Sequence, residues 1–156
     1  MKALWGTAVG ILAVDQTSKY WIVEALGLKD IGRIDVMSPY LTFVMAWNQG
    51  INFGLGASGA DWMRWALIAL ALAICIAVYF WAARKGTTGF LVGGGLVIGG
   101  AIGNVIDRIQ YGAVADFLNM SCCGIHNPYA FNVADIAIFA GAALLILQPS
   151  EQKKTG

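Results

Sequence analysis

Four long apolar runs divide this chain, and they constrain its fold more than any other feature. They cover approximately residues 4–26, 62–83, 88–106 and 131–147. At about 1.5 Å per residue, helices of this length reach across most of a hydrocarbon core about 30 Å thick. The chain is also 58% hydrophobic and only 12% charged, unlike a soluble domain. We therefore predict an all-α membrane protein with four transmembrane helices, forming one integral membrane domain over residues 1–156.

Positively charged residues mark the ends of the runs that we expect to face the cytoplasm, because cytoplasmic loops collect Lys and Arg. They are Lys2 before the first run, Arg84 and Lys85 after the second, and Lys153 and Lys154 after the fourth. Both termini are therefore predicted to be cytoplasmic. The connections at residues 27–61 and 107–130 then lie outside, and they hold nearly all the polar residues.

The stretch "LTFVMAW" at residues 41–47 has a different pattern from the long runs. Large apolar side chains alternate with smaller ones, and a turn containing glycine precedes a second short run. Alternation with a period of two is typical of a strand. We expect an extracytoplasmic β-hairpin or small sheet at about residues 36–57, between the first two helices. On pattern alone, an ordinary extracellular loop fits equally well.

The third run carries glycines at a period that favours close helix packing. Gly95, Gly99 and Gly103 are spaced by four residues. Small residues at this spacing let helix backbones approach each other in lipid. We expect this helix to lie at the centre of the bundle.

Ionisable side chains within or beside a membrane span are costly, so they mark functional sites or buried partners. Asp15 and Lys19 are four residues apart and suit an ion pair on one helix face, with structural and functional roles both open. Asn104 and Arg108 have the same spacing at the outer end of the third run. Arg108 could meet a phosphate, a carbonyl or a carboxylate. We expect Asp107 to be its local partner.

Two further carboxylates, Asp116 and Asp135, are flanked by apolar residues near the outer surface. Asn127 and Pro128 provide an N-cap and a first helical residue, which predicts that the fourth helix starts there. Asn132 and Asp135 then share a face, with Asp135 roughly 10 Å from the helix start. Only one turn region separates the two acids, so they can meet. Two carboxylates in a poorly hydrated pocket tend to share a proton, as in an aspartic peptidase.

The residues alone leave three functions open. A small transporter or proton-coupled channel could use the same acids, although they cluster toward one face rather than at the midplane. The carboxylates could also be packing pairs in a non-catalytic assembly factor. A zinc site is disfavoured, because His126 is the one histidine and no second ligand pair accompanies it. We expect no metal, no cofactor and, at a net charge of +1, no nucleic-acid partner.

Five stretches of the chain resemble, in order and spacing, the motifs of bacterial lipoprotein signal peptidase, signal peptidase type II. They are "DQTSK", "WNQGINFG", "GGAIGNVIDR", "GAVADFL" and "FNVADIAI", and they run from Asp15 to about Gly141. The resemblance implies that Asp116 and Asp135 are the catalytic pair. It implies supporting or substrate-binding positions at Asp15, Lys19, Asn48, Gly50, Asn104, Asp107, Arg108 and Asn132. The sequence departs from the family pattern at Ile51, Asn52 and Ile136.

The resemblance also implies a fold and a reaction. The family is a four-helix aspartic peptidase of the bacterial inner membrane with a small periplasmic sheet. It cleaves the signal peptide from prolipoproteins on the N-terminal side of a diacylglyceryl-modified Cys. The expected partners are this lipid-modified substrate and membrane phospholipid, and we expect a monomer with its active site near the periplasmic face. The residues do not assign base and acid, but a helix N-terminus near Asp135 favours that residue as the base.

Overall fold

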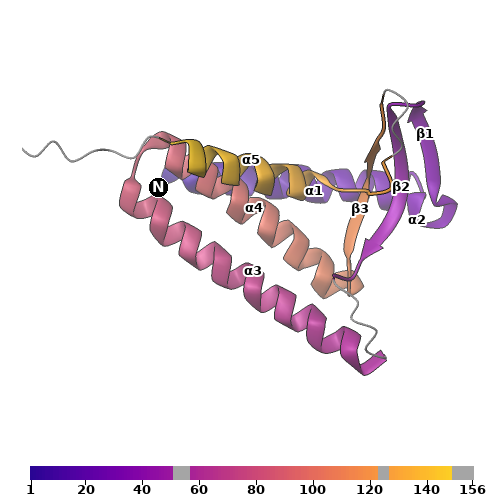
Figure 1. Ribbon diagram of the computed structural model, residues 1–156, viewed down its shortest axis with the longest axis horizontal. Helices are drawn as coiled ribbons and strands as arrows, with labels where there is room; N and C mark the ends of the chain where they lie inside the picture. The colour runs from indigo at the N-terminus through magenta and orange to yellow at the C-terminus, as the bar shows by residue number, and fades with distance from the viewer. Residues whose placement is uncertain (51–56, 123–126, 149–156) are drawn as a thin grey trace, which may run out of the picture.

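A computed structural model describes residues 1–50, 57–122 and 127–148, with the backbone alone described for residues 57–60. Long helices run along the molecule, and a small sheet stands across one end of them (Figure 1). The helical elements are α1 (Lys2–Lys19), its π-helical continuation η1 (Tyr20–Ala25), α2 (Leu28–Ile31), α3 (Ala57–Lys85), α4 (Thr88–Tyr111) and α5 (Val133–Leu147). The strands are β1 (Arg33–Met37), β2 (Leu41–Asn48) and β3 (Val114–Met120). The N-terminus lies at the end of the helices away from the sheet (Figure 1).

The helices follow the four predicted apolar runs, with two extensions. The helix α3 begins at Ala57 rather than near residue 62, and α4 continues through Tyr111, so Asp107 and Arg108 are helical residues. Among the described residues, two helices are long and apolar enough to cross a membrane, Asp61–Lys85 and Thr88–Tyr111. Length and composition therefore support two of the four predicted spans.

The predicted central position of the glycine-rich helix is confirmed, because α4 packs against α1, α3 and α5. A Cβ atom placed on Gly95 or Gly99 would lie 2.5 Å from the carbonyl oxygen of Leu4 or Ala8, respectively. Gly100 faces the backbone of α5 in the same way. The missing side chains therefore let α1 and α5 contact the backbone of α4 directly.

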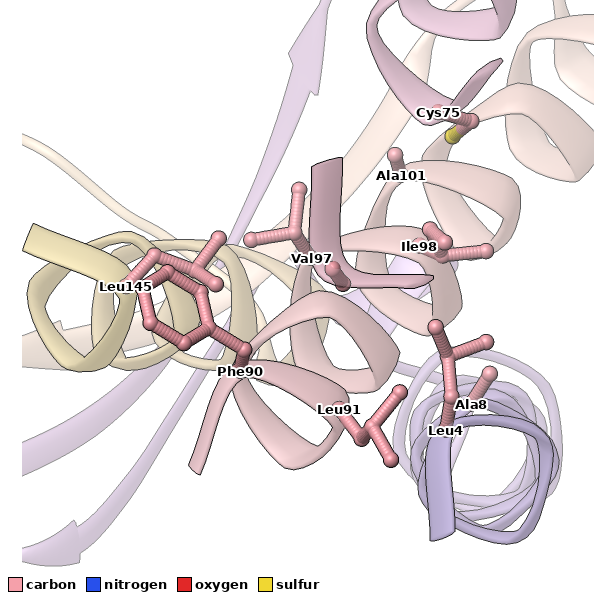
Figure 2. Close-up of a cluster of buried hydrophobic side chains, with 10 residues drawn as sticks. Leu4, Ala8, Cys75, Phe90, Leu91, Val97, Ile98, Ala101 and Leu145 are labelled. Atoms are coloured by element: carbon pink, nitrogen blue, oxygen red, sulfur yellow. The ribbon is translucent and has the colours of Figure 1, made fainter. Parts of the chain in front are cut away.

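An apolar cluster holds the helices together in the half of the bundle away from the sheet. Figure 2 shows it between α1, α3, α4 and α5. Its buried members are Leu4, Ala8, Cys75, Ala82, Phe90, Leu91, Val97, Ile98, Ala101 and Leu145. Their close packing contributes to the stability of this half of the bundle.

The sheet has the order β1-β2-β3, and both pairs of strands are antiparallel. The strand predicted from the alternation at residues 41–47 is confirmed, and it corresponds to β2. The alternative of an ordinary loop is therefore wrong. β2 pairs with the upstream strand β1, which the sequence interpretation did not predict. Residues 51–56 of the predicted element lie outside the described residues. The third strand, β3, was not predicted.

A second apolar cluster fixes the sheet to the end of the first helix. Val23 in η1 and Leu28 in α2 pack against Ala115 and Phe117 of β3. The Phe117 ring also meets Phe43 of β2 edge to face, with ring centroids 6.1 Å apart. Because side chains alternate along a strand, burial of Ala115 and Phe117 on this face turns the intervening residue to the other face.

Candidate active site

That intervening residue is Asp116, which is only 3% exposed. It lies opposite Ala46 in the pairing of β2 with β3. Its Oδ2 accepts a hydrogen bond of 3.1 Å from Nδ2 of Asn48 at the end of β2. Its Oδ1 accepts one of 2.7 Å from Nδ2 of Asn132. The carboxyl group is thus buried between two amide donors.

The second acid, Asp135, lies in the first turn of α5 and belongs to a capping box. Asn132 is the N-cap: its Oδ1 accepts from the Asp135 backbone N–H at 2.9 Å, and Asp135 Oδ2 accepts from the Asn132 backbone N–H at 3.3 Å. The predicted start at Asn127 and Pro128 is therefore wrong. Asn127 instead accepts from the Tyr129 N–H in the turn before the helix. Asp135 lies three residues from the cap, not about 10 Å along the helix.

Two asparagines connect the acids. Asn132 donates to Asp116 from its side chain and to Asp135 from its backbone. Asn104 of α4 donates from Nδ2 to Asp135 Oδ1 at 3.0 Å, while its Oδ1 faces Nδ2 of Asn132 at 3.3 Å. The structure therefore brings Asp116 and Asp135 into one hydrogen-bonded network at the point where β3, α4 and α5 meet.

The environment of Asp116 changes the pKa of its carboxyl group. Burial raises the pKa of Asp116 from 3.8 to about 6, and the negative charge of Asp135 adds to the increase. The hydrogen bonds from Asn48 and Asn132 and the positive charge of Lys19 act in the opposite direction. The Asp116 carboxyl group can therefore keep a proton under conditions in which an exposed aspartate is ionised.

The predicted pair of Asp15 and Lys19 is confirmed, with Nζ 2.8 Å from Oδ2. Lys19 also makes an ion pair of 2.7 Å with Asp107. The prediction that Asp107 pairs with Arg108 is therefore wrong, because Lys19 on α1 takes its place. Gln16 joins the cluster through Asp15 and Asp107, at 3.1 and 3.2 Å. The sequence interpretation missed Gln16, although a polar residue beside Asp15 inside an apolar run was a visible signal.

Arg108 lies near the acids without a direct ion pair to them. None of the ion pairs among the described residues includes it, and its guanidinium donates to the backbone oxygen of Asn104 at 3.5 Å. It interacts electrostatically with Asp116, Asp135 and Asp107. Its only hydrogen bond within the described part of the chain is this one to Asn104.

Gly50 shapes the other side of the site. Its backbone has a φ of 89°, which favours glycine, and its N–H donates to Asn48 Oδ1 at 3.0 Å. That bond leaves Nδ2 of Asn48 directed at Asp116. The departures at Ile51 and Asn52 lie outside the described residues.

An apolar groove of about 590 Å³ opens beside Asp135. Its lining residues are Phe131, Asp135, Ile136, Phe139 and Ala140. Ile136 is one of the departures from the family pattern, so that change adds an apolar surface next to an acid. Over the described part of the chain, no group of three His, Cys, Asp or Glu side chains is placed to hold a metal ion.

The model of the family described as signal peptidase (SPase) II matches residues 7–149. The chain belongs to the signal peptidase II family. It is therefore a protease of the lipoprotein signal peptidase type, as the sequence motifs indicated.

Individual relatives agree with this membership. The chain is 42% identical over 136 residues to a lipoprotein signal peptidase of Methylorubrum extorquens (strain PA1), covering 87% of this chain and 78% of the relative. It is 39% identical over 155 residues to one of Pseudomonas syringae pv. tomato, covering 98% and 88%. Two solved structures described as bacterial membrane enzymes share the fold, at TM-scores of 0.75 and 0.72 and identities of 26% and 25%. Both alignments cover at least 92% of each chain.

The residues matched to signal peptidase II motifs gather at the sheet end of the helices. Asp116, Asp135, Asn48, Asn104 and Asn132 are joined by hydrogen bonds. Lys19 links a second group to them, since Nζ lies 3.4 Å from Oδ1 of Asn104. The two groups therefore form one continuous polar site in a mainly apolar protein.

Proposed function

We propose that this chain is an intramembrane aspartic endopeptidase that removes the signal peptide from diacylglyceryl-modified prolipoproteins. Cleavage takes place on the N-terminal side of the lipidated Cys. The observation that carries the proposal is the connection of Asp116 and Asp135 through Asn132, with Asp116 and Asn132 buried and Asp135 half-buried beside the groove. The relatives of this chain are lipoprotein signal peptidases, which supports the choice of substrate.

The environments of the two acids support different roles for them. Asp135 accepts from Asn104 and from the Asn132 backbone at the positive end of a helix, where an anion is stabilised. We assign it as the general base. The raised pKa of Asp116 lets it keep a proton and act as the general acid.

The reaction follows from these roles. Asp135 takes a proton from water, and the water oxygen attacks the scissile carbonyl carbon. Asp116 donates its proton to the carbonyl oxygen, so that a neutral tetrahedral intermediate forms. The intermediate collapses as the amide nitrogen takes the proton held by Asp135, the C–N bond breaks, and the hydroxyl proton returns to Asp116. The products are a signal peptide with a free carboxyl group and a lipidated Cys with a free amino group.

Arg108 and the groove beside Asp135 provide contacts for the substrate. The free donors of Arg108 suit a peptide carbonyl or another polar group near the scissile bond. The apolar lining of Phe131, Ile136 and Phe139 suits apolar side chains or an acyl chain of the substrate. The reaction needs no cofactor or metal, because two carboxyl groups supply both the base and the acid.

The arrangement of charges supports an orientation in the membrane. We propose that α1 with η1, α3, α4 and α5 all cross the bacterial inner membrane as one integral domain. Lys2, Arg84 and Lys85 lie at the end away from the sheet, which we assign to the cytoplasm. The polar site then lies near the periplasmic face. This placement favours a peptidase over a transporter, whose site would lie near the midplane.

The test is a processing assay with purified protein in detergent. A diacylglyceryl-modified precursor should yield a shorter product on a gel, and the unmodified precursor should not. Asp116→Asn and Asp135→Asn should each abolish the product. Both variants should still be folded, with a thermal unfolding transition like that of the unchanged protein. Asp61→Asn is the matched control, because Asp61 is exposed at the start of α3. Processing at the normal rate by either catalytic variant would refute the assignment. Absence of product from the unchanged protein would refute the proposed substrate.

A further inference from the structure

Two buried carboxylates outside the catalytic pair hold the backbone directly before it. Asp107 Oδ2 accepts from the N–H of Ala115 at 3.1 Å. Asp15 Oδ1 accepts from the N–H of Ala134 at 2.9 Å. Ala115 precedes Asp116 and Ala134 precedes Asp135, so each catalytic acid has one of these anchors at the preceding peptide.

Lys19 connects the two anchors. Its ammonium lies 2.8 Å from Asp15 and 2.7 Å from Asp107, and its third contact is Asn104 Oδ1 at 3.4 Å. An ammonium has three N–H donors, and three acceptors surround this one. Lys19 is 5% exposed, and both carboxylates are at most 1% exposed.

We propose that Lys19, Asp15 and Asp107 form a clamp that sets the relative placement of the two backbone segments carrying Asp116 and Asp135. Lys19, Asp15 and Asp107 are thus positioning residues for the cleavage reaction. The proposal rests on the proposed function, in which these two acids act together on one bond.

The geometry explains why a charged cluster is suited to this task. Asp116 lies in β3 and Asp135 lies in α5, and these elements are already joined by backbone hydrogen bonds between Leu118 and Phe131 and by the bond from Asn132 to Asp116. The charged cluster adds a contact to the peptide directly before each acid. The cost of removing buried charges from water offsets much of the Coulombic attraction between them. This cluster therefore adds little to the stability of the fold. Its hydrogen bonds are directional, however, and they reach both segments from α1 and α4. A displacement of the reacting groups by about 1 Å can lower a rate about 10²-fold.

The test compares two nearly isosteric changes at one anchor. In Asp107→Asn an amide oxygen in the place of Oδ2 still accepts from the Ala115 N–H. In Asp107→Leu the acceptor is gone. We expect kcat for the lipid-modified precursor to stay within about threefold of the unchanged protein for Asn and to fall about 10²-fold for Leu, with KM nearly constant. Lys29→Met controls for loss of an exposed ion pair, that of Lys29 with Glu24.

Amide hydrogen exchange gives a readout that does not depend on activity. Ala115 should exchange faster in Asp107→Leu than in Asp107→Asn, whereas Ala134, held by Asp15, should change little. Equal kcat values or equal Ala115 exchange in the two folded variants would overturn the clamp.

The unchanged protein supplies a check if Asp107→Leu does not fold. Ala115 and Ala134 should exchange more slowly than Val133, the first residue of α5, and similar rates for the three would also overturn the clamp. If the unchanged protein does not cleave the precursor, the proposed function fails while the exchange experiment still tests the clamp.

Discussion

The side chain of Asn132 donates a hydrogen bond of 2.7 Å to Asp116, across the boundary between α5 and β3. Asn132 is also the N-cap of α5. One residue therefore starts the helix that carries one acid and restrains the other acid in the sheet.

Substitution at Asn132 should separate these two tasks. Asn132→Ser keeps a good N-cap but is too short to hold Asp116, so stability should stay near that of the unchanged protein while kcat/KM falls. Asn132→Ala loses both tasks and should also lower the free energy of unfolding by about 1 kcal/mol. Thermal unfolding and precursor cleavage measure the two effects. Full activity of the Ser variant would show that the bond to Asp116 is not needed.

The pH dependence of cleavage should report Asp116. Its pKa of about 6 means that the proposed acid loses its proton as the pH rises through that value, so kcat/KM should fall on the alkaline side. The same group affects folding with the same sign. Because its pKa is higher in the folded state than the ordinary 3.8, its contribution to stability is complete below pH 3.8 and is lost as the pH rises to about 6. A rate profile from pH 5 to 8 checks the first statement, and a flat profile would contradict the assigned role.

Asn48→Ala should move that profile. The hydrogen bond from Asn48 lowers the pKa of Asp116, so its removal should raise the pKa and shift the alkaline fall of kcat/KM to higher pH. The same rate profile measures the shift. A shift to lower pH would indicate that Asn48 acts on a different group.

Gly99→Ala should loosen the bundle, because the added Cβ would lie 2.5 Å from the carbonyl oxygen of Ala8. We expect a loss of about 1 to 3 kcal/mol in the free energy of unfolding, as for other overpacked positions. Gly10→Ala is the matched control, since no atom lies within 4 Å of a Cβ there. Thermal unfolding in detergent compares the two. Equal melting temperatures would show that α1 and α4 can separate without cost.

Local patterns in the sequence predicted those parts of the structure that depend on near neighbours. Apolar runs gave approximate helix positions, and the spacing of Asp15 and Lys19 gave their ion pair. The spacing of Gly95 and Gly99 predicted close packing of α4 against its neighbours. Each of these signals is contained in a window of a few helical turns.

Contacts between distant segments were predicted less well. Nothing near Asp107 indicates that Lys19, on another helix, is a better partner than the adjacent Arg108. The pairing of β2 with β3 joins segments separated by the two longest helices, so alternation in β2 could not identify it.

The start of α5 was a different kind of error, since Asn127 with Pro128 and Asn132 with Asp135 are both valid start patterns. The capping box at Asn132 is the stronger one, because it satisfies two backbone N–H groups reciprocally.

Asp15 and Lys19 lie in one helix and neutralise each other there. A ribosome finishes α1 long before it reaches Asp107, so under the proposed topology the nascent helix meets the lipid without its final partner. The local pair lets these two side chains enter with no net charge between them, which reduces the cost of insertion. Asp107 then arrives with α4 and adds its negative charge to a partly assembled bundle. Under the proposed topology, the α1 pair therefore enters the bilayer neutral, and Asp107 joins it only after α4 has been made.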